Sequence, residues 1–351
     1  MIQENREAIR VLIVEDSPTT ALAIKTILNA DPKIIVLGIA MDGQEAVSLA
    51  TRLKPDLITM DVNLPLLDGL EVTRQVMASC PTPILILSNS AFTKQAQKVF
   101  EAISYGALDV ANKEDFLSRD IQQAGQNLIE KVKFLAGLKV IRHPMGGLSR
   151  RADRYRTETR MSATLDRLVA IVGSTGGPHA VGEILKQFPK SFPCGIVIVI
   201  HLANGFTAGF VEWLQSLSQI QVKAGVQGES ILPGTAYVAP TGNHLRVTKD
   251  HTLELGDEPP QNGLKPFGNY LLESVARHYK SGAIGVILTG MGRDGATGIE
   301  QIKAYGGVTI AQDEKSSAIF GMPRAAIETG TVDRILSLDR VPGEIIELLK
   351  R

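Results

Sequence analysis

The chain has 351 residues, which is enough for two or three domains at about 150 residues each. Its 37 basic and 37 acidic residues give a net charge of zero, which argues against a protein that mainly coats nucleic acid or a membrane surface. The two cysteines show neither metal nor disulfide spacing, and the polar start does not resemble a signal peptide. No apolar run approaches the roughly 18–20 residues of a membrane span. These features predict a cytoplasmic protein.

Short apolar runs alternate with helical patterns in the first third of the chain. The runs predict buried strands at 10–14, 34–39, 56–60, 84–87 and 108–111, with helices between them, for example at 19–29 and 93–104. This alternation predicts a doubly wound parallel sheet, because the strands are too apolar for half-exposed antiparallel ones. A further helix is expected over 115–138.

The composition changes after this helix. Residues 141–163 carry six arginines against two acids, together with Pro144 and the pair Gly146–Gly147. Such a segment is typical of a mobile linker, and its charge would serve either as a dock for a partner or simply as a solvated tether. We therefore expect a first domain over 1–130, a helix end and linker over 131–164, and a second domain over 165–351.

The second domain repeats the α/β alternation with different motifs. Apolar runs at 168–172, 195–200 and 283–288 predict parallel strands, and runs at 236–239, 245–248 and 252–255 predict short antiparallel strands. The expected fold is a doubly wound α/β domain with a parallel sheet and an antiparallel hairpin region.

Acidic side chains follow the strands of the first domain. Glu15 and Asp16 end the first strand and Asp61 ends the third, while Ser88 and Lys113 follow the fourth and fifth. Ligands bind at this edge of an open parallel sheet, and converging carboxylates are relieved by a hard divalent cation.

Residues 8–130 resemble the receiver domain of bacterial two-component response regulators, which has a flavodoxin-like (βα)5 fold. The resemblance implies that Asp61 accepts a phosphoryl group from a histidine kinase. It also implies a Mg²⁺ site and phosphoryl contacts. The residues implied for Mg²⁺ are Glu15, Asp16, Asp61 and the carbonyl of Asn63, and those for the phosphoryl oxygens are Ser88 and Lys113. The alternative is a sheet edge with solvated acids that is not phosphorylated.

Two positions depart from the receiver pattern. Glu114 follows Lys113 where the family usually has proline, and Val110 stands where it usually has an aromatic switch residue. The first departure concerns the geometry of the loop after Lys113, and the second concerns how the phosphoryl signal leaves the site.

Three polar side chains follow the core strands of the second domain. Ser174 lies in Gly-Ser-Thr-Gly-Gly-Pro after the strand 168–172, His201 follows 195–200, and Asp294 lies in a glycine-rich loop after 283–288. Separately each pattern is ambiguous: the glycine-rich turn could bind phosphate, and a single histidine is more often structural. Together they are the nucleophile, base and orienter that a serine hydrolase requires.

Residues 165–335 resemble the chemotaxis protein-glutamate methylesterase family (CheB). The motifs that carry the resemblance are GSTGGP, IVIVIH, GESILPGTAYVAPTGNHLRV, LTGMGRDGA and AQDEKSSAIFGMPRAA. The resemblance implies Ser174 as nucleophile, His201 as base and Asp294 as orienter, with an oxyanion site at Met291 and Thr175. The implied substrate is a glutamate γ-methyl ester on a chemoreceptor, with glutamine deamidation as a related reaction and no cofactor for the esterase step. The implied partners are a histidine kinase and the receptor, without nucleic acid or membrane insertion.

The surroundings of the triad depart from the family pattern. Residues 202–204 read Leu-Ala-Asn where Met-Pro-Pro is usual, and 265–269 read Lys-Pro-Phe-Gly-Asn where an Arg-Pro-Ser-x-Asp segment is usual. We expect both segments to form a rim that selects the receptor and leaves the chemical step little affected.

Other functions are open from sequence. The chain could act mainly as a glutamine amidase, or be a catalytically silent regulatory protein, which the intact triad argues against. A DNA-binding response regulator would need a basic winged or helix-turn-helix output domain, and the near-neutral second domain does not fit one.

Overall fold

The computed structural model describes residues 8–89, 93–117, 121–138 and 165–350. The chain divides into two compact units, Met1–Leu148 and Ser149–Arg351. The predicted linker at 141–163 lies outside the described residues.

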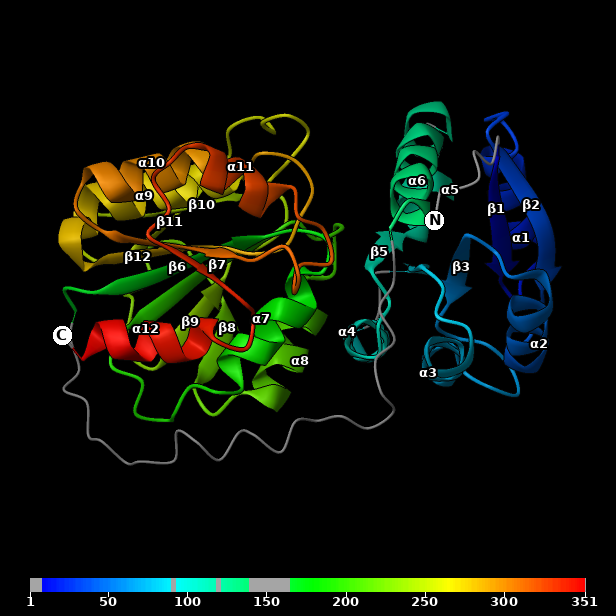
Figure 1. Cartoon of the computed structure of the whole chain (residues 1–351), viewed down its shortest axis with the longest axis horizontal. Helices are drawn as coiled ribbons and strands as arrows, with labels where there is room; N and C mark the ends of the chain where they lie inside the picture. Colours follow the sequence, from blue (N-terminus) through cyan, green and yellow to red (C-terminus); the bar gives the residue numbers. More distant parts are fainter. Residues whose placement is uncertain (1–7, 90–92, 118–120, 139–164, 351) are drawn as a thin grey trace. The chain divides into compact units, whose positions relative to one another are not determined.

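The first unit is a five-stranded parallel sheet with the strand order β2-β1-β3-β4-β5. Its strands are β1 (Ile9–Val14), β2 (Ile34–Ala40), β3 (Leu57–Asp61), β4 (Ile84–Ser88) and β5 (Asp109–Asn112). Its helices are α1 (Pro18–Leu28), α2 (Gly43–Leu53), α3 (Gly69–Ser79), α4 (Thr93–Ser104), α5 (Lys113–Leu117) and α6 (Ile121–Ala136). Helices α2, α3 and α4 cover one face, and α1 and α6 the other (Figure 1).

Local sequence explains where these elements begin. Strands β3 and β4 are buried along their whole length, as expected for the centre of a sheet that helices cover on both faces. Asp42 and Asp68 cap the helices that follow them, each accepting a hydrogen bond from a backbone amide three residues on. Within the predicted helix over 115–138 the described residues are helical in α5, up to Leu117, and in α6, from Ile121 to Ala136. Residues 118–120 between them lie outside the described part.

The second unit is a seven-stranded, wholly parallel sheet with the order β14-β13-β12-β6-β7-β9-β8. Its strands are β6 (Leu168–Gly173), β7 (Gly195–Ile200), β8 (Gln221–Ala224), β9 (Thr235–Val238), β12 (Ala283–Ile287), β13 (Val308–Gln312) and β14 (Arg334–Leu336). A separate antiparallel pair is formed by β10 (His244–Val247) and β11 (Leu253–Gly256).

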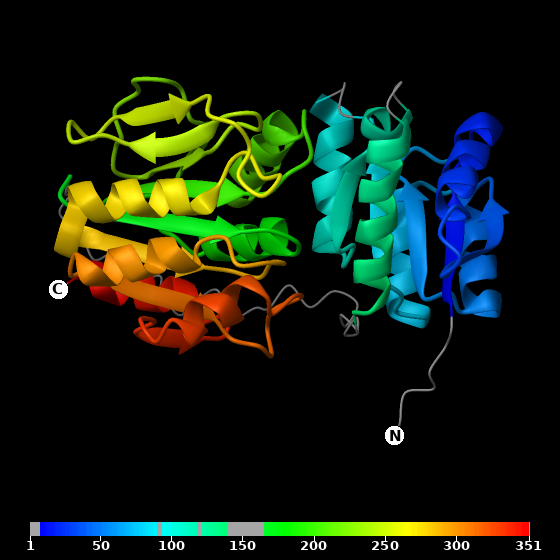
Figure 2. The same ribbon diagram turned by 90° about the horizontal axis from the view of Figure 1, so that it is seen from above.

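Helices pack on both faces of this sheet. They are α7 (Gly177–Leu185), α8 (Thr207–Leu217), α9 (Gly268–Tyr279), α10 (Ala296–Ala304), α11 (Met322–Glu328) and α12 (Val341–Leu349). Helices α9, α10 and α11 lie on one face and α7, α8 and α12 on the other (Figure 1). The β10–β11 hairpin stands beside α9, outside the main sheet (Figure 2). The predicted doubly wound architecture and hairpin are confirmed.

One strand prediction is wrong. The run at 236–239 was expected to be antiparallel, but β9 pairs in parallel with both β7 and β8. All four residues of β9 are buried, which fits a strand inside a covered parallel sheet. Four residues are too few for apolar periodicity to separate the two kinds of pairing.

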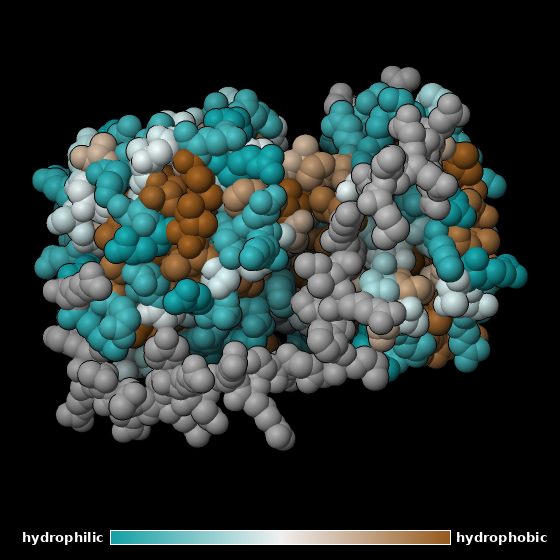
Figure 3. Space-filling view, in the orientation of Figure 1, coloured by the Kyte–Doolittle hydropathy of each residue, from teal (hydrophilic) through white to brown (hydrophobic). Residues whose placement is uncertain are grey.

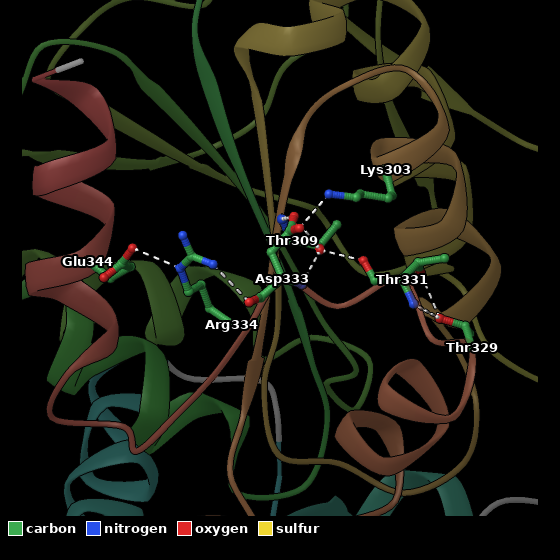
Figure 4. A network of polar contacts seen from close by, with 7 residues as sticks. All are labelled: Lys303, Thr309, Thr329, Thr331, Asp333, Arg334 and Glu344. Atoms are coloured by element: carbon green, nitrogen blue, oxygen red, sulfur yellow. Dashed lines mark hydrogen bonds and ion pairs between the residues drawn. The ribbon is translucent and has the colours of Figure 1, made fainter.

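A polar network joins the last strands of the second sheet. Asp333, just before β14, accepts hydrogen bonds from the Thr309 backbone amide (3.0 Å) and pairs with Lys303 of α10. The Thr309 hydroxyl donates to the Thr331 carbonyl (2.7 Å) and accepts from the Asp333 amide (2.8 Å). Figure 4 shows Lys303 and Thr309 next to Asp333, with Thr331 hydrogen-bonded to the Thr309 hydroxyl. The network fastens the short edge strand β14 to β13.

Apolar side chains fill both units, and their surfaces are mostly hydrophilic with separate hydrophobic patches on the side seen in Figure 3. Among the described residues, no helix combines the length and the apolar character needed to cross a bilayer.

Candidate active site and phosphorylation site

The sheet order of the second unit brings the three predicted catalytic residues to one edge. Strands β12, β6 and β7 are neighbours, and their carboxyl ends lead to Asp294, Ser174 and His201. In a parallel sheet these ends lie at one edge, so three residues far apart in sequence are placed at the same part of the domain.

His201 and Asp294 are in direct contact. His201 Nε2 lies 2.8 Å from Asp294 Oδ2, and the two side chains are only 8% and 2% exposed. Asp294 also accepts the backbone amides of Gly268 on Oδ2 (2.6 Å) and Asn269 on Oδ1 (3.0 Å). These are the first amides of α9, whose positive dipole end favours a carboxylate. Asp294 is therefore held in one orientation while it faces the imidazole.

Ser174 lies on the tight turn between β6 and α7 and is half-buried. Its amide donates to the Thr289 carbonyl (3.0 Å), and its carbonyl accepts from the Gly177 amide (2.7 Å). Gly176 completes the turn at φ 77°, in the left-handed region that glycine enters without strain. The turn is thus fixed by backbone bonds on both sides of the serine.

The loop after β12 packs tightly against this turn. A Cβ added at Gly290 would lie 2.7 Å from Ser174 Cβ and 2.9 Å from its amide nitrogen, so only glycine fits. Met291 follows directly and has a side chain that is 53% exposed, while Thr175 is buried. The two residues predicted for the oxyanion site therefore lie next to Gly290 and Ser174 in the chain, on segments that touch.

Thr289 is a buried centre of hydrogen bonds that sequence reasoning missed. Its hydroxyl donates to the Thr175 carbonyl (3.0 Å) and accepts from the Ile319 amide (2.9 Å). Its amide donates to Oε1 of Gln312, which is fully buried on β13. Thr289 and Gln312 hold the serine turn, the Gly290 loop and the loop before α11 together. Both residues lie within motifs that carry the family resemblance, but only the fold shows that they are hydrogen-bonded to each other.

The first unit gathers its predicted phosphorylation residues at one sheet edge. Ligand atoms of Glu15, Asp16 and Asp61 all lie within 4.8 Å of one another. The ammonium of Lys113 is buried and lies 2.6 Å from both Glu15 Oε2 and Asp61 Oδ2. Ser88 is buried at the end of β4.

The charges at this edge are only partly balanced. Burial raises the pKa of Glu15 above its ordinary value, with a further contribution from Asp61, although Lys113 opposes the shift. The Lys113 ammonium lies 2.6 Å from Glu15 Oε2 and is shared with Asp61, so a single cation faces three acids here. Clustered carboxylate oxygens with an excess of negative charge fit a hard divalent cation such as Mg²⁺.

Both units match known protein families, and the whole chain matches known relatives. The model described as CheB methylesterase matches residues 169–345, and the model described as response regulator receiver domain matches residues 11–124. The chain is 40% identical over 348 residues to protein-glutamate methylesterase/protein-glutamine glutaminase 1 of Syntrophus aciditrophicus, with 97% of this chain and 98% of that one covered. It is 37% identical over 349 residues to protein-glutamate methylesterase/protein-glutamine glutaminase of Pyrococcus abyssi, with 97% of this chain and 94% of that one covered.

The chain belongs to the CheB methylesterase family. Among solved structures, the catalytic domain of Thermotoga maritima CheB matches with a TM-score of 0.51 and 39% identity, over 52% of this chain and 98% of that one. The resemblance stated from sequence is thereby confirmed, and the second unit is a CheB domain rather than a DNA-binding output domain.

The segment 265–269 of this CheB domain contacts the Asp294 carboxylate. Its role in selecting the receptor stays a prediction, and the structure adds that the backbone amides of Gly268 and Asn269 donate hydrogen bonds to Asp294. The Asn269 side chain also accepts the Gly298 amide (2.8 Å), which ties the start of α9 to α10. The segment supports the orienting carboxylate because α9 begins within it. At the second departure, residues 202–203 are half-buried and 204 is exposed.

The two departures in the receiver domain have structural counterparts. Val110 is buried, and its carbonyl accepts a hydrogen bond from Lys131 of α6 (3.0 Å). The Glu114 amide donates to the Asn112 side chain (3.1 Å). Helix α6 is therefore tied to β5 at the position of the missing aromatic residue.

Proposed function

We propose that this chain is a serine hydrolase that removes methyl groups from glutamate γ-methyl esters of chemoreceptors and also deamidates receptor glutamines. The observation that carries the proposal is the buried His201–Asp294 contact at the edge that holds Ser174. The names of the relatives supply the substrate class. A partner histidine kinase and a cytoplasmic location complete the proposal, and the two free cysteines are consistent with that location.

The chemistry follows from the orientation of the imidazole. His201 turns Nε2 toward Asp294, so Nδ1 is the nitrogen available to Ser174. Nδ1 accepts the hydroxyl proton as Oγ attacks the ester carbonyl, and Asp294 stabilises the imidazolium. The proton then passes to the leaving methoxide, which departs as methanol and leaves an acyl-serine. Water, activated by His201, hydrolyses this ester to free glutamate and Ser174.

The same steps serve an amide substrate, with ammonia in place of methanol. In both reactions the carbonyl oxygen becomes negative in the tetrahedral intermediate. The backbone amides of Met291 and Thr175 are our candidates for stabilising it, because amides fixed before the reaction need no reorganisation during it.

The receiver domain would control this activity through Asp61. Glu15, Asp16, Asp61 and the Asn63 carbonyl would hold Mg²⁺, which when bound neutralises charge on the phosphoryl oxygens. The Lys113 ammonium already lies 2.6 Å from the Asp61 carboxylate, and it would pair with the phosphoryl group formed there. Ser88, buried at the same edge, would donate a hydrogen bond to it.

The first prediction tests the triad. Ser174→Ala and His201→Ala should each lower methanol release from a methylated receptor by about 10³-fold or more, because a serine hydroxyl is a poor nucleophile without its base. Asp294→Ala should cost less, since it does not bond to substrate. Emission of Trp213, the single tryptophan of the chain, reports whether the catalytic domain is still folded. Wild-type activity in Ser174→Ala would contradict the assignment.

A further inference from the structure

A second buried histidine lies behind the triad. His244 opens β10 and is completely shielded from solvent. Its Nδ1 lies 3.1 Å from the backbone nitrogen of Phe267, and its Nε2 lies 3.3 Å from the Pro259 carbonyl oxygen. The ring also packs edge-on against Tyr270, with 4.7 Å between ring centroids.

These two contacts define how the ring binds. A backbone amide can only donate, so Nδ1 accepts the Phe267 proton. A carbonyl can only accept, so Nε2 carries a proton and donates it to Pro259. The two contacts together select the neutral Nε2–H form, with both polar atoms of the ring used.

The Phe267 amide is the first of three consecutive amides that are held by side chains. His244 binds the amide of Phe267, and Asp294 binds those of Gly268 and Asn269. Phe267 precedes the first residue of α9 and offers no side-chain cap of its own. Amides at a helix start lack partners within the helix, so these partners from other elements set its position.

The chain of contacts therefore runs from the hairpin to the general base. Peptide planes are rigid, so a shift at the Phe267 amide moves the neighbouring Gly268 amide. The Gly268 amide lies 2.6 Å from Asp294 Oδ2, the same oxygen that contacts His201 Nε2 at 2.8 Å. A displacement of the Phe267 amide would therefore also change the geometry of the His201–Asp294 contact.

We propose that His244 is a positioning residue of the hydrolase: it fixes the start of α9 so that two helix amides orient Asp294 toward His201. The inference rests on the proposed function. It assigns a role to His244, for which the sequence pattern alone indicates none.

The test uses two isosteric replacements in the full chain. In His244→Asn, the side-chain oxygen can take the place of Nδ1 and still accept the Phe267 amide. In His244→Gln, the side-chain nitrogen can take the place of Nε2, but nothing accepts that amide. We expect His244→Gln to lower kcat roughly tenfold with KM unchanged, and His244→Asn to stay within about threefold of wild type.

Asp294→Ala supplies the control for a merely structural role. If His244 acts through Asp294, adding His244→Gln to Asp294→Ala should lower kcat no further. A full additional tenfold loss in the double variant, or equal losses in the asparagine and glutamine variants, would overturn the proposal. Trp213 emission checks folding, and if His244→Gln unfolds, His244→Phe replaces it as an aromatic ring without an acceptor.

A second readout separates this inference from the proposed substrate. The rate at which a fluorophosphonate labels Ser174 depends on activation by His201 and Asp294, but not on a receptor. If the parent protein releases no methanol while labelling follows the expected order of variants, the proposed substrate fails and the role of His244 stands. Labelling that is insensitive to His244→Gln would overturn the role itself.

Discussion

Gly290 is packed so closely that its position has no room for even one side-chain carbon. A Cβ at this position would come within 2.4 Å of Met322 Sδ and 2.7 Å of Ser174 Cβ. The Gly290 carbonyl also accepts the Met322 amide (2.8 Å), so the loop cannot move away without breaking that bond. Any relief of the clash must displace the serine turn or α11.

We expect Gly290→Ala to lower kcat by about 10²-fold, because a displacement of the nucleophile near 1 Å costs about that much. Gly292→Ala is the matched control on the same loop. A Cβ at Gly292 meets nothing within 4 Å, although its φ of 91° adds strain of about 1–2 kcal/mol. The measurement is methanol release with Trp213 emission as a folding check. Equal kcat values for Gly290→Ala and wild type would show that the serine turn tolerates the displacement.

At the level of elements, the edge strand β14 depends on polar contacts. It has three residues, of which Arg334 and Ile335 are exposed, so it contributes little apolar burial. Asp333 joins it to β13 through Thr309 and to α10 through Lys303. Burial alone would raise the pKa of Asp333, but hydrogen bonds from Lys303 and Thr309 outweigh it and hold the pKa below its ordinary value.

The lowered pKa gives the network a defined pH dependence. An acid whose folded-state pKa is depressed stabilises the fold above its ordinary pKa of 3.8, and this contribution is lost as the pH falls below it. Asp333→Asn should lower the free energy of unfolding at pH 7 by about 1 kcal/mol, since charge-assisted hydrogen bonds become neutral ones. The difference from wild type should shrink as the pH falls from about 4 toward 3.

Urea unfolding followed by Trp213 emission measures this difference in the catalytic domain. The tryptophan lies on α8, away from the network, so the substitution does not change its surroundings. The exposed pair Arg324–Glu314 provides a control: Glu314→Gln should change stability by less than about 0.5 kcal/mol. A difference for Asp333→Asn that is constant from pH 7 to pH 3 would contradict the assignment.

On the scale of the whole molecule, each unit has its own core and its own site. The receiver domain places Asp61 beside Glu15 and Lys113, and the CheB domain places Ser174 beside the Gly290 loop. The residues proposed for one site all lie in the first unit and those proposed for the other all lie in the second, so the effect of each can be tested separately.

Asp61→Ala should remove the stimulation of methanol release by a small phosphodonor and Mg²⁺. The reason is that the phosphoryl acceptor is lost, while the esterase residues lie in the other unit. Chelating Mg²⁺ should remove the same stimulation from the wild type. The assay compares initial rates with and without phosphodonor, with Ser174→Ala as the blank. Stimulation that survives in Asp61→Ala would place the phosphorylation site elsewhere.

Deleting residues 1–160 tests the direction of control. If the unphosphorylated receiver inhibits the esterase, the shortened protein should have a higher basal rate than the full chain. A rate no higher than that of the resting full chain would argue instead that phosphorylation activates the CheB domain directly.

The residues of both sites could be predicted from sequence because parallel α/β folds place polar residues immediately after apolar strands. Ser174 and His201 directly follow such a run, Asp61 and Ser88 end one, and Asp16 and Asp294 lie in the loops that come next. The burial pattern that makes the strands also marks their ends, and these ends lie at one edge in any parallel sheet. The fold class followed from the same alternation of strands and helices, and the family from the resemblance carried by motifs such as GSTGGP and LTGMGRDGA.

Contacts between distant segments were decided only by the tertiary structure. Nothing local marks β9 as parallel, Thr289 as a centre of hydrogen bonds, or His244 as a partner of Phe267. Each of these depends on which elements pack together, and a hydrogen bond between residues far apart in the chain leaves no periodic trace in either segment. The segment 265–269 shows the difference most clearly: its sequence predicts a substrate rim, and only the packing of α9 reveals that its backbone amides also hold Asp294.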